Sequence, residues 1–120
     1  MSPPRFFRVE CDEDTLVAVT LCEITSLADE NLEAELEQLE RQLEQPHVKN
    51  LVIDFGQVSY LESCTLNTMV GLWKRVRMRR GKMALCNVSD LAREILEITK
   101  FDTLWPMLPS REEALTTVKS

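Results

Sequence analysis

The 120-residue sequence predicts a single α/β domain with a mostly parallel sheet, on two observations. Runs rich in aliphatic residues alternate with segments of helical periodicity in the order β-β-α-β-α-β-α-β-α, which indicates parallel strands joined by helices and entered by an antiparallel hairpin strand. In addition, 44% hydrophobic and 28% charged residues is an ordinary globular mixture. The length suits one domain over residues 1–120, with a core from about 5 to 118.

The first two strands are predicted to form the hairpin. Residues 5–11 make a short edge strand, residues 11–15 are polar and turn-like, and the Val-rich run 16–22 is apolar enough to be buried on both faces of the sheet.

The first helix has the clearest pattern. Ser26 can cap it, and Asp29 three residues later completes a capping-box pattern. Leucines at 32, 36, 39 and 43 lie on one stripe, and Pro46 ends the helix. Because the stripe spans barely two heptads, we expect a helix facing the core instead of a coiled coil.

A central strand follows at Val48–Phe55, and then a turn through residues 57–62. The second helix runs from about Cys64 to Arg80, and Gly81 stands where a left-handed C-cap belongs. Its predicted core face comprises Leu66, Met69, Val70, Trp73 and Val76.

The last third of the chain repeats this alternation. Residues 83–86 form a strand, and Ser89 caps a helix that carries Leu91, Ile95, Leu96 and Ile98. Residues 103–107 form an edge strand, as Pro106 indicates. Ser110 opens a final helix, with Glu113 three residues later and with Leu115 and Val118 as its apolar residues.

The net charge of −6 is concentrated in one segment of the chain. Seven acidic residues and Arg41 lie between Asp29 and Gln45, so this segment alone carries the net charge of the chain. A second block is entirely basic: Lys74, Arg75, Arg77, Arg79, Arg80 and Lys82. The blocks are either two solvated helix faces or a docking site for a partner of opposite charge. A pI near 4.8 argues against binding nucleic acid by phosphate neutralisation.

The sequence lacks the residues that several functional classes of protein require. One histidine and four cysteines are too few for most zinc frameworks, and there is no Cys-x-x-Cys, Gly-rich phosphate loop or Gly-x-Ser-x-Gly elbow. We therefore expect no catalytic residues, no metal and no cofactor. Residues 1–9 lack the apolar core of a signal peptide, and the longest apolar run, 16–22, is far shorter than a membrane span. These features predict a cytoplasmic protein without membrane insertion and with reduced cysteines.

One segment at the carboxyl edge of the predicted sheet concentrates reactive side chains. Glu62-Ser63-Cys64-Thr65 joins a buried strand to a helix N-terminus, where free backbone N–H groups favour negative charge. Cys22 and Cys86 fall at the same edge. The segment is either structural, a regulatory or partner-contact site, or a reactive thiol; the last lacks an adjacent base, because His47 is the only histidine and is expected in a surface turn.

The sequence Leu51-Val-Ile-Asp-Phe-Gly-Gln-Val-Ser-Tyr-Leu-Glu-Ser-Cys64 resembles the STAS domain, the domain of sulphate transporters and anti-sigma-factor antagonists. In this family an apolar strand and a short turn precede Asp-Ser-Ser/Thr-Gly-Leu at a helix start. Residues 21–25, 81–89 and 95–104 resemble further family stretches, so the similarity covers about Phe7 to Val118.

The resemblance implies a non-enzymatic signalling module that binds an anti-sigma factor with serine-kinase activity through the strand-to-helix edge around residues 58–66. In the family, phosphorylation of the second Ser/Thr of the motif blocks this binding. The register puts Cys64 at that position, which implies loss of the usual switch or its shift to Ser63 or Thr65. The implied partner contacts are Glu23, Thr25, Tyr60, Glu62, Ser63, Cys64, Thr65 and Leu66.

Two alternatives remain open at this point. The chain could be the cytoplasmic STAS subunit of a transporter complex, such as a lipid-transport ATPase. Less favoured is a thiol-based redox sensor at Cys64.

Overall fold

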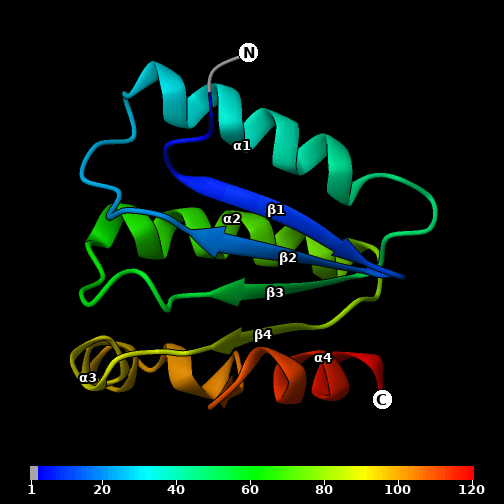
Figure 1. Ribbon diagram of the computed structural model, residues 1–120. Helices are drawn as coiled ribbons and strands as arrows, with labels where there is room; N and C mark the ends of the chain where they lie inside the picture. Colours follow the sequence, from blue (N-terminus) through cyan, green and yellow to red (C-terminus); the bar gives the residue numbers. More distant parts are fainter. Residues whose placement is uncertain (1–2) are drawn as a thin grey trace.

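Five strands form one mixed sheet in the order β1-β2-β3-β4-β5 in the computed structural model, which describes residues 3–120 (Figure 1). The strands are β1 (Phe7–Asp12), β2 (Thr15–Thr20), β3 (Asn50–Asp54), β4 (Met83–Cys86) and β5 (Met107–Leu108). β1 pairs with β2 in antiparallel register, and every later pair is parallel. The predicted α/β class, the entry hairpin and the mostly parallel sheet are thereby confirmed.

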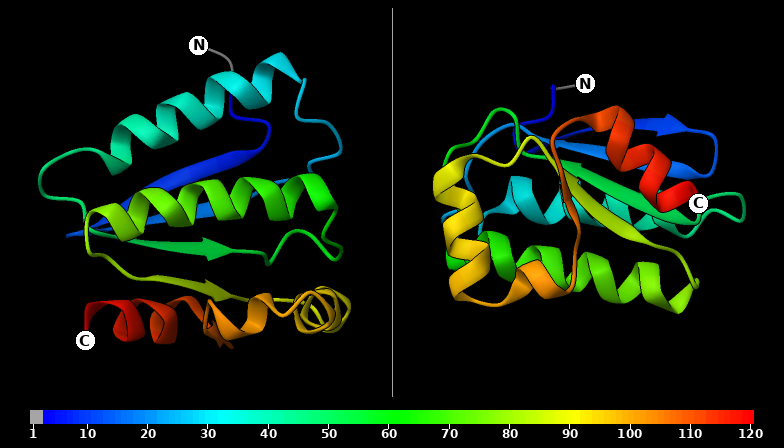
Figure 2. Two further views of the ribbon diagram at one scale, coloured as in Figure 1. Left: turned by 180° about the vertical axis from the view of Figure 1, so that it is seen from behind. Right: turned by 90° about the horizontal axis from the view of Figure 1, so that it is seen from below.

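Helices cover both faces of this sheet. They are α1 (Glu30–Leu43), α2 (Ser63–Met78), α3 (Asp90–Ile98) and α4 (Arg111–Lys119), with a short 3-10 turn at Phe101–Thr103. α1 and α2 lie side by side on one face, and α4 lies on the other (Figure 2). The predicted alternation of strands and helices is confirmed, with the 3-10 turn as the one addition.

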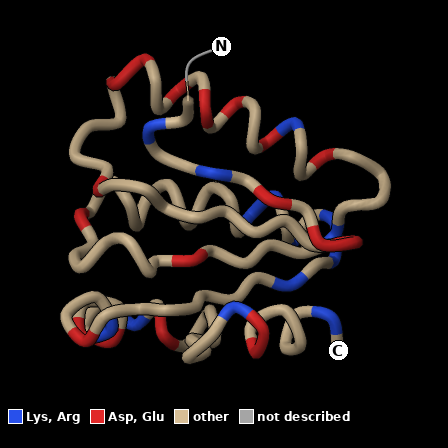
Figure 3. Tube along the Cα trace, in the orientation of Figure 1, with Lys and Arg blue, Asp and Glu red and all other residues tan. Residues whose placement is uncertain are grey.

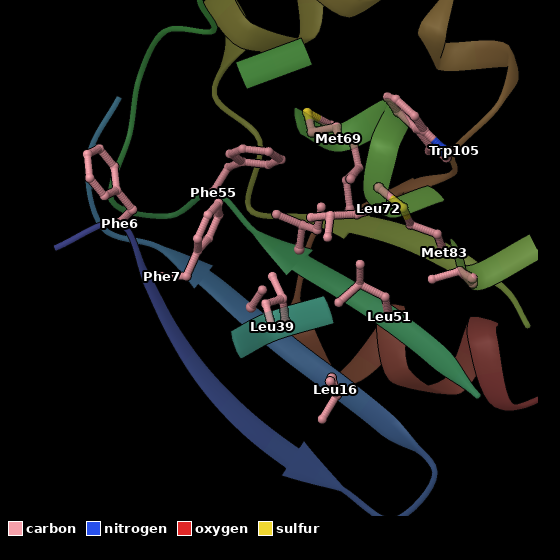
Figure 4. Packing of buried hydrophobic residues seen from close by; sticks show 14 of the residues in the cluster. Phe6, Phe7, Leu16, Leu39, Leu51, Phe55, Met69, Leu72, Met83 and Trp105 are labelled. Carbon is pink, nitrogen blue, oxygen red and sulfur yellow. The ribbon is translucent and has the colours of Figure 1, made fainter. Parts of the chain in front are cut away.

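Burial follows the parallel arrangement of the strands. Every residue of β2, β3 and β4 is buried, whereas β1 at the edge has exposed positions. The larger core lies between the sheet and helices α1, α2 and α3, and includes Leu16, Leu39, Leu51, Phe55 and Leu72 (Figure 4). A smaller core under α4 contains Val17, Val52 and Val118.

The start of α1 differs from the sequence prediction. Asp29, not Ser26, is the N-cap, and its Oδ1 accepts hydrogen bonds from the amides of Asn31 at 2.8 Å and Leu32 at 3.2 Å. Ser26 instead accepts the amide hydrogen of Ala28 in the turn before the helix. Both residue types favour caps, and the carboxylate also interacts favourably with the helix dipole.

The core face of α2 is rotated from the predicted one. Met69 and Val76 are buried as predicted, but Leu66, Val70 and Trp73 are only half-buried at the rim of the core. The remaining buried positions are Thr65, Thr68 and Leu72. The hydrophobic pattern of the sequence does not predict this buried face, because two of its residues are threonines. One of them, Thr68, is satisfied locally by donating its hydroxyl to the carbonyl of Cys64 at 2.9 Å.

The end of α2 corrects the predicted role of Gly81. The left-handed residue is Arg80, with φ of 59°, and no glycine has positive φ among the described residues. Gly81 is needed for space, because a Cβ there would lie 1.7 Å from the carbonyl oxygen of Lys49. The glycine lets the chain that follows α2 pass directly beside the start of β3.

The helix predicted after Ser89 is confirmed as α3. Within it Leu91 and Ile98 are 48% and 77% exposed, and the buried residues are Ala92 and Leu96. The strand predicted over residues 103–107 is wrong, because β5 comprises only Met107 and Leu108. The preceding segment serves packing instead, since Trp105 is fully buried and stacks on the ring of Phe101. The caps at Ser89 and Ser110 are confirmed.

The end of α2 yields a stability prediction. We expect Gly81→Ala to lower the melting temperature by several degrees, because the added methyl group would clash with the backbone carbonyl of Lys49, which cannot move aside as a flexible side chain could. Arg80→Gly should be neutral or slightly stabilising, because it removes the cost of a left-handed side-chain-bearing residue. Thermal melts followed by circular dichroism measure both. The opposite order of the two variants would support the C-cap role for Gly81.

Candidate functional site at the start of α2

The carboxyl ends of β2, β3 and β4 point to the same edge of the sheet (Figure 1). The chain leaves these ends in three segments, residues 21–25, 55–62 and 87–89, and the second leads into α2. In open α/β sheets this edge is the usual place for ligands and partners.

The last residue of β3 ties these segments together. The Oδ1 atom of Asp54 accepts hydrogen bonds from the amide of Gly56 at 2.8 Å and from the Nδ2 of Asn87 at 3.2 Å. Its Oδ2 accepts a hydrogen bond from the guanidinium of Arg111 at 3.3 Å. Asn87 has a φ of 55°, a left-handed conformation that asparagine tolerates. One buried carboxylate thus joins the loop after β3, the turn after β4 and the first residue of α4.

The loop over residues 55–62 is held from inside by apolar side chains. Phe55, Val58 and Leu61 are buried in the main core. The carbonyl of Ser59 accepts a hydrogen bond from the hydroxyl of Ser89 at 2.8 Å, which attaches the loop to the start of α3. Between these anchors Tyr60 projects outward and is 41% exposed.

The first turn of α2 presents both open backbone donors and exposed side chains. Glu62 is the N-cap, but its side chain makes no capping hydrogen bond. No residue of the first turn is acidic. Ser63 is exposed, while Glu62, Cys64 and Leu66 are half-buried. An uncapped helix start of this kind favours a negative charge nearby.

Thr65 differs from its neighbours because it faces the interior. It is 3% exposed, and its hydroxyl oxygen accepts a hydrogen bond from the amide of Ile24 at 3.4 Å. This contact connects α2 to the segment after β2, where Ile24 is fully buried and its neighbours Glu23 and Thr25 are exposed. Thr65 therefore positions the site from below and offers its hydroxyl to no partner at the surface.

The sequence-predicted residues thus fall into two groups. The exposed or half-exposed group lies along one edge and comprises Glu23, Thr25, Tyr60, Glu62, Ser63, Cys64 and Leu66; we call it the α2 edge. The other group is Thr65 alone. Sequence reasoning missed Asp54 as the centre of the supporting network. The only signal was its position between a buried strand and Gly56, since the contacts from Asn87 and Arg111 require the fold.

The cysteines near this edge are free thiols. Burial raises the pKa of the Cys22 thiol, and its Sγ donates to the carbonyl of Arg5 at 3.2 Å. Burial, with the charge of Asp54 nearby, raises the pKa of Cys86 to about 12. Both thiols therefore remain protonated at neutral pH, and neither is a thiolate nucleophile.

Residues 3–120 contain neither a cluster of metal-ligating side chains nor a helix that could span a membrane. No three His, Cys, Asp or Glu side chains gather as a metal ion would require. No helix in this part of the chain has the length and apolarity needed to span a bilayer.

Known proteins resemble this chain over most of its length. The family model of the STAS domain matches residues 18–114. The chain is 30% identical over 105 residues to a protein of Bordetella bronchiseptica that bears the name anti-sigma factor antagonist BtrV, covering 88% of this chain and 87% of that protein.

Solved structures share the fold. SpoIIAA, an anti-sigma factor antagonist in its unphosphorylated form, superposes with a TM-score of 0.77 at 19% identity, over 94% of this chain and 96% of that chain. Its phosphorylated form from Bacillus gives 0.66 at 20% identity, over 93% and 98%. An anti-sigma-factor antagonist (STAS) domain protein of Planctomyces limnophilus gives 0.76 at 24% identity, over 95% and 98%.

Proposed function

Because this chain belongs to the STAS domain family, we propose that it acts as an anti-sigma factor antagonist, a non-enzymatic cytoplasmic protein that binds a kinase-type anti-sigma factor through the α2 edge. Two kinds of support meet here. The relative that bears this name matches most of both chains. The α2 edge also offers exposed side chains on backbone that is anchored from inside.

The observation that carries the proposal is the way Tyr60 and Ser63 stand at the surface. Tyr60 projects from a loop fixed by Leu61 in the core and by the Ser59–Ser89 hydrogen bond. Ser63 opens α2, whose next residues are held by Thr65. An exposed tyrosine on fixed backbone is a favourable interface anchor, since little conformational entropy is lost when it binds.

The proposal includes a changed phosphorylation switch. In the family register Cys64 occupies the phosphoacceptor position, and a serine/threonine kinase does not modify a thiol there in the usual way. Of the two neighbouring hydroxyls, Ser63 is exposed and Thr65 is buried. We therefore infer that the standard switch is lost, and that any residual phosphorylation occurs at Ser63. A phosphate at the uncapped start of α2 would bring about −1.5 to −2 charges to the binding surface.

The binding proposal is tested by co-purification with kinase-type anti-sigma factors encoded beside this gene. We expect one of them to bind the wild-type protein, and Tyr60→Ala to weaken that binding at least about tenfold. Ile98→Ala is the matched control, because Ile98 is a large exposed apolar side chain at the far end of α3 and should change the affinity little. Isothermal calorimetry gives the affinities.

Two results would contradict the binding proposal. One is failure of every such neighbour to bind, above all if a transport ATPase co-purifies instead. The other is an equal loss of affinity in Tyr60→Ala and Ile98→Ala.

The switch is tested by intact-mass measurement after incubation with ATP and the cognate kinase. We expect the wild-type protein to gain no phosphate, or a slow partial phosphate that Ser63→Ala removes. Cys64→Ser should gain one phosphate readily, because it restores a hydroxyl at the acceptor position without changing the size of the side chain much. Rapid phosphorylation of the wild type that Ser63→Ala leaves intact would overturn the proposed loss of the switch.

A further inference from the structure

The outer edge of β1 has no strand beside it, because β1 lies at one end of the sheet and pairs with β2 alone (Figure 1). Just before β1, the carbonyl of Phe6 accepts the amide hydrogen of Leu21 at 2.8 Å. Phe6 therefore belongs to a hydrogen-bonded pair, and such pairs alternate along an antiparallel ladder. It follows that the backbone groups of Phe7, Val9 and Cys11 point away from β2, toward the open edge.

Most of these outward backbone groups are unused. Glu35 of α1 accepts the amide hydrogen of Phe7 at 3.0 Å. Within residues 3–120, no hydrogen bond reaches the carbonyl of Phe7 or the outward amides and carbonyls of Val9 and Cys11. A row of free donors and acceptors of this kind is a template for pairing with another strand.

A groove of about 560 Å³ lies between this edge and α1. Phe7 and Val9 line it from the strand, and the helix lines it with neutral side chains at Asn31, Ala34, Gln38 and Gln42. Glu35 is the one acidic residue in the lining, and its carboxylate is bound by backbone amides of residues 5–7. The other glutamates of α1 do not line this groove. This flank of the helix can therefore face a copy of itself without charge repulsion.

The opposite face of β1, toward α4, carries two charges of opposite sign. The side chains of Arg8 and Glu10 are 52% and 45% exposed and lie 3.5 Å apart on this face. Glu10 is also bound by Arg111, the first residue of α4, at 3.0 Å. Figure 3 shows the change of sign along the strand, where a basic position is followed by acidic ones.

We propose that a second copy of this chain binds at this edge, with its β1 antiparallel to the first and a two-fold axis between the two Val9 residues. The amide of each Val9 then donates to the carbonyl of the other Val9. The amide of each Cys11 donates to the carbonyl of Phe7 in the other copy. The two sheets join into one, and the neutral flanks of the two α1 helices meet over the joint.

The charges of the strand favour a second copy and select this register. Directly opposite residues have numbers that add to 18, so Arg8 of each copy faces Glu10 of the other. These are positions between the hydrogen-bonded pairs, where opposed side chains lie closest and opposite charges stabilise pairing. Moving the centre by one residue would set Arg8 against Arg8 or Glu10 against Glu10. An unrelated strand would need the same alternation of charge, which this chain already has.

The dimer goes beyond the proposed anti-sigma factor antagonism and is independent of it, since it uses β1 and one flank of α1 and none of the residues of the α2 edge.

Sedimentation velocity over a range of protein concentrations at low ionic strength tests the dimer. We expect twice the monomer mass at high concentration. Val9→Pro should give a monomer, because it removes an amide that the ladder with β2 does not use and the second copy needs. The matched control is Val9→Thr, which keeps both the amide and the branched shape and should leave the dimer intact.

The register is tested by reversing the charges one at a time. Arg8→Glu sets glutamate against glutamate, and Glu10→Arg sets arginine against arginine, so each variant alone should dimerise about tenfold more weakly than the wild type. An equimolar mixture of the two should form a heterodimer, because every glutamate then faces an arginine. Circular dichroism melts show whether each variant is folded. The two sets of variants are independent, so either set decides the proposal if a member of the other fails to fold.

Three results would overturn the dimer. The first is a wild-type protein that stays monomeric at all concentrations, including the case in which the amides of Val9 and Cys11 become protected from exchange only when another protein is added. The second is a dimer that Val9→Pro leaves intact. The third is a mixture of folded Arg8→Glu and Glu10→Arg chains that associates no better than either variant alone.

Discussion

The arrangement of the candidate site depends on one buried carboxylate. Asp54 ends the central strand and is 7% exposed, yet it accepts hydrogen bonds from Gly56, Asn87 and Arg111. These donors come from the loop before α2, the turn before α3 and the start of α4. Leaving such a buried group without a partner costs about 1–3 kcal/mol, so the three segments are held together at one point. The positive charge of Arg111 offsets part of the free-energy cost of burying the Asp54 carboxylate.

A second contact completes the support of the α2 edge. The hydroxyl of Thr65 accepts the amide hydrogen of Ile24, which joins the start of α2 to the segment after β2. Together the two contacts fix three loops from three neighbouring strands, and the side chains between the anchors, such as Tyr60 and Ser63, face outward. A surface built in this way loses little entropy when a partner binds, and it can be altered by one charge at the helix start.

Pattern and periodicity were sufficient for the order of the elements, because each parallel strand is a continuous apolar run and each helix has an apolar stripe. They failed where a residue serves a contact that only the fold creates. Thr65 and Thr68 occupy core positions that a hydrophobic stripe does not reveal, and Gly81 is required by the nearby backbone of Lys49 instead of by its own φ. The edge around Ser63 and Cys64 was predictable from its place between strand and helix. Its anchor Asp54 was not, because Arg111 lies 57 residues away in the chain.

Most of the acidic residues between Asp29 and Gln45 make contacts within the structure. Much of the acidic segment is occupied in capping α1, holding the N-terminal strand and binding Arg75, and only its outer side remains free. The α2 edge is a separate surface from this acidic side of α1.

The proposed binding of a kinase-type anti-sigma factor to the α2 edge is tested most directly by amide hydrogen exchange, measured with and without the bound anti-sigma factor. We predict slower exchange in residues 23–25 and 57–66, with α4 unchanged. Protection confined to other surfaces, with residues 57–66 exchanging as in the free protein, would contradict a binding role for the α2 edge.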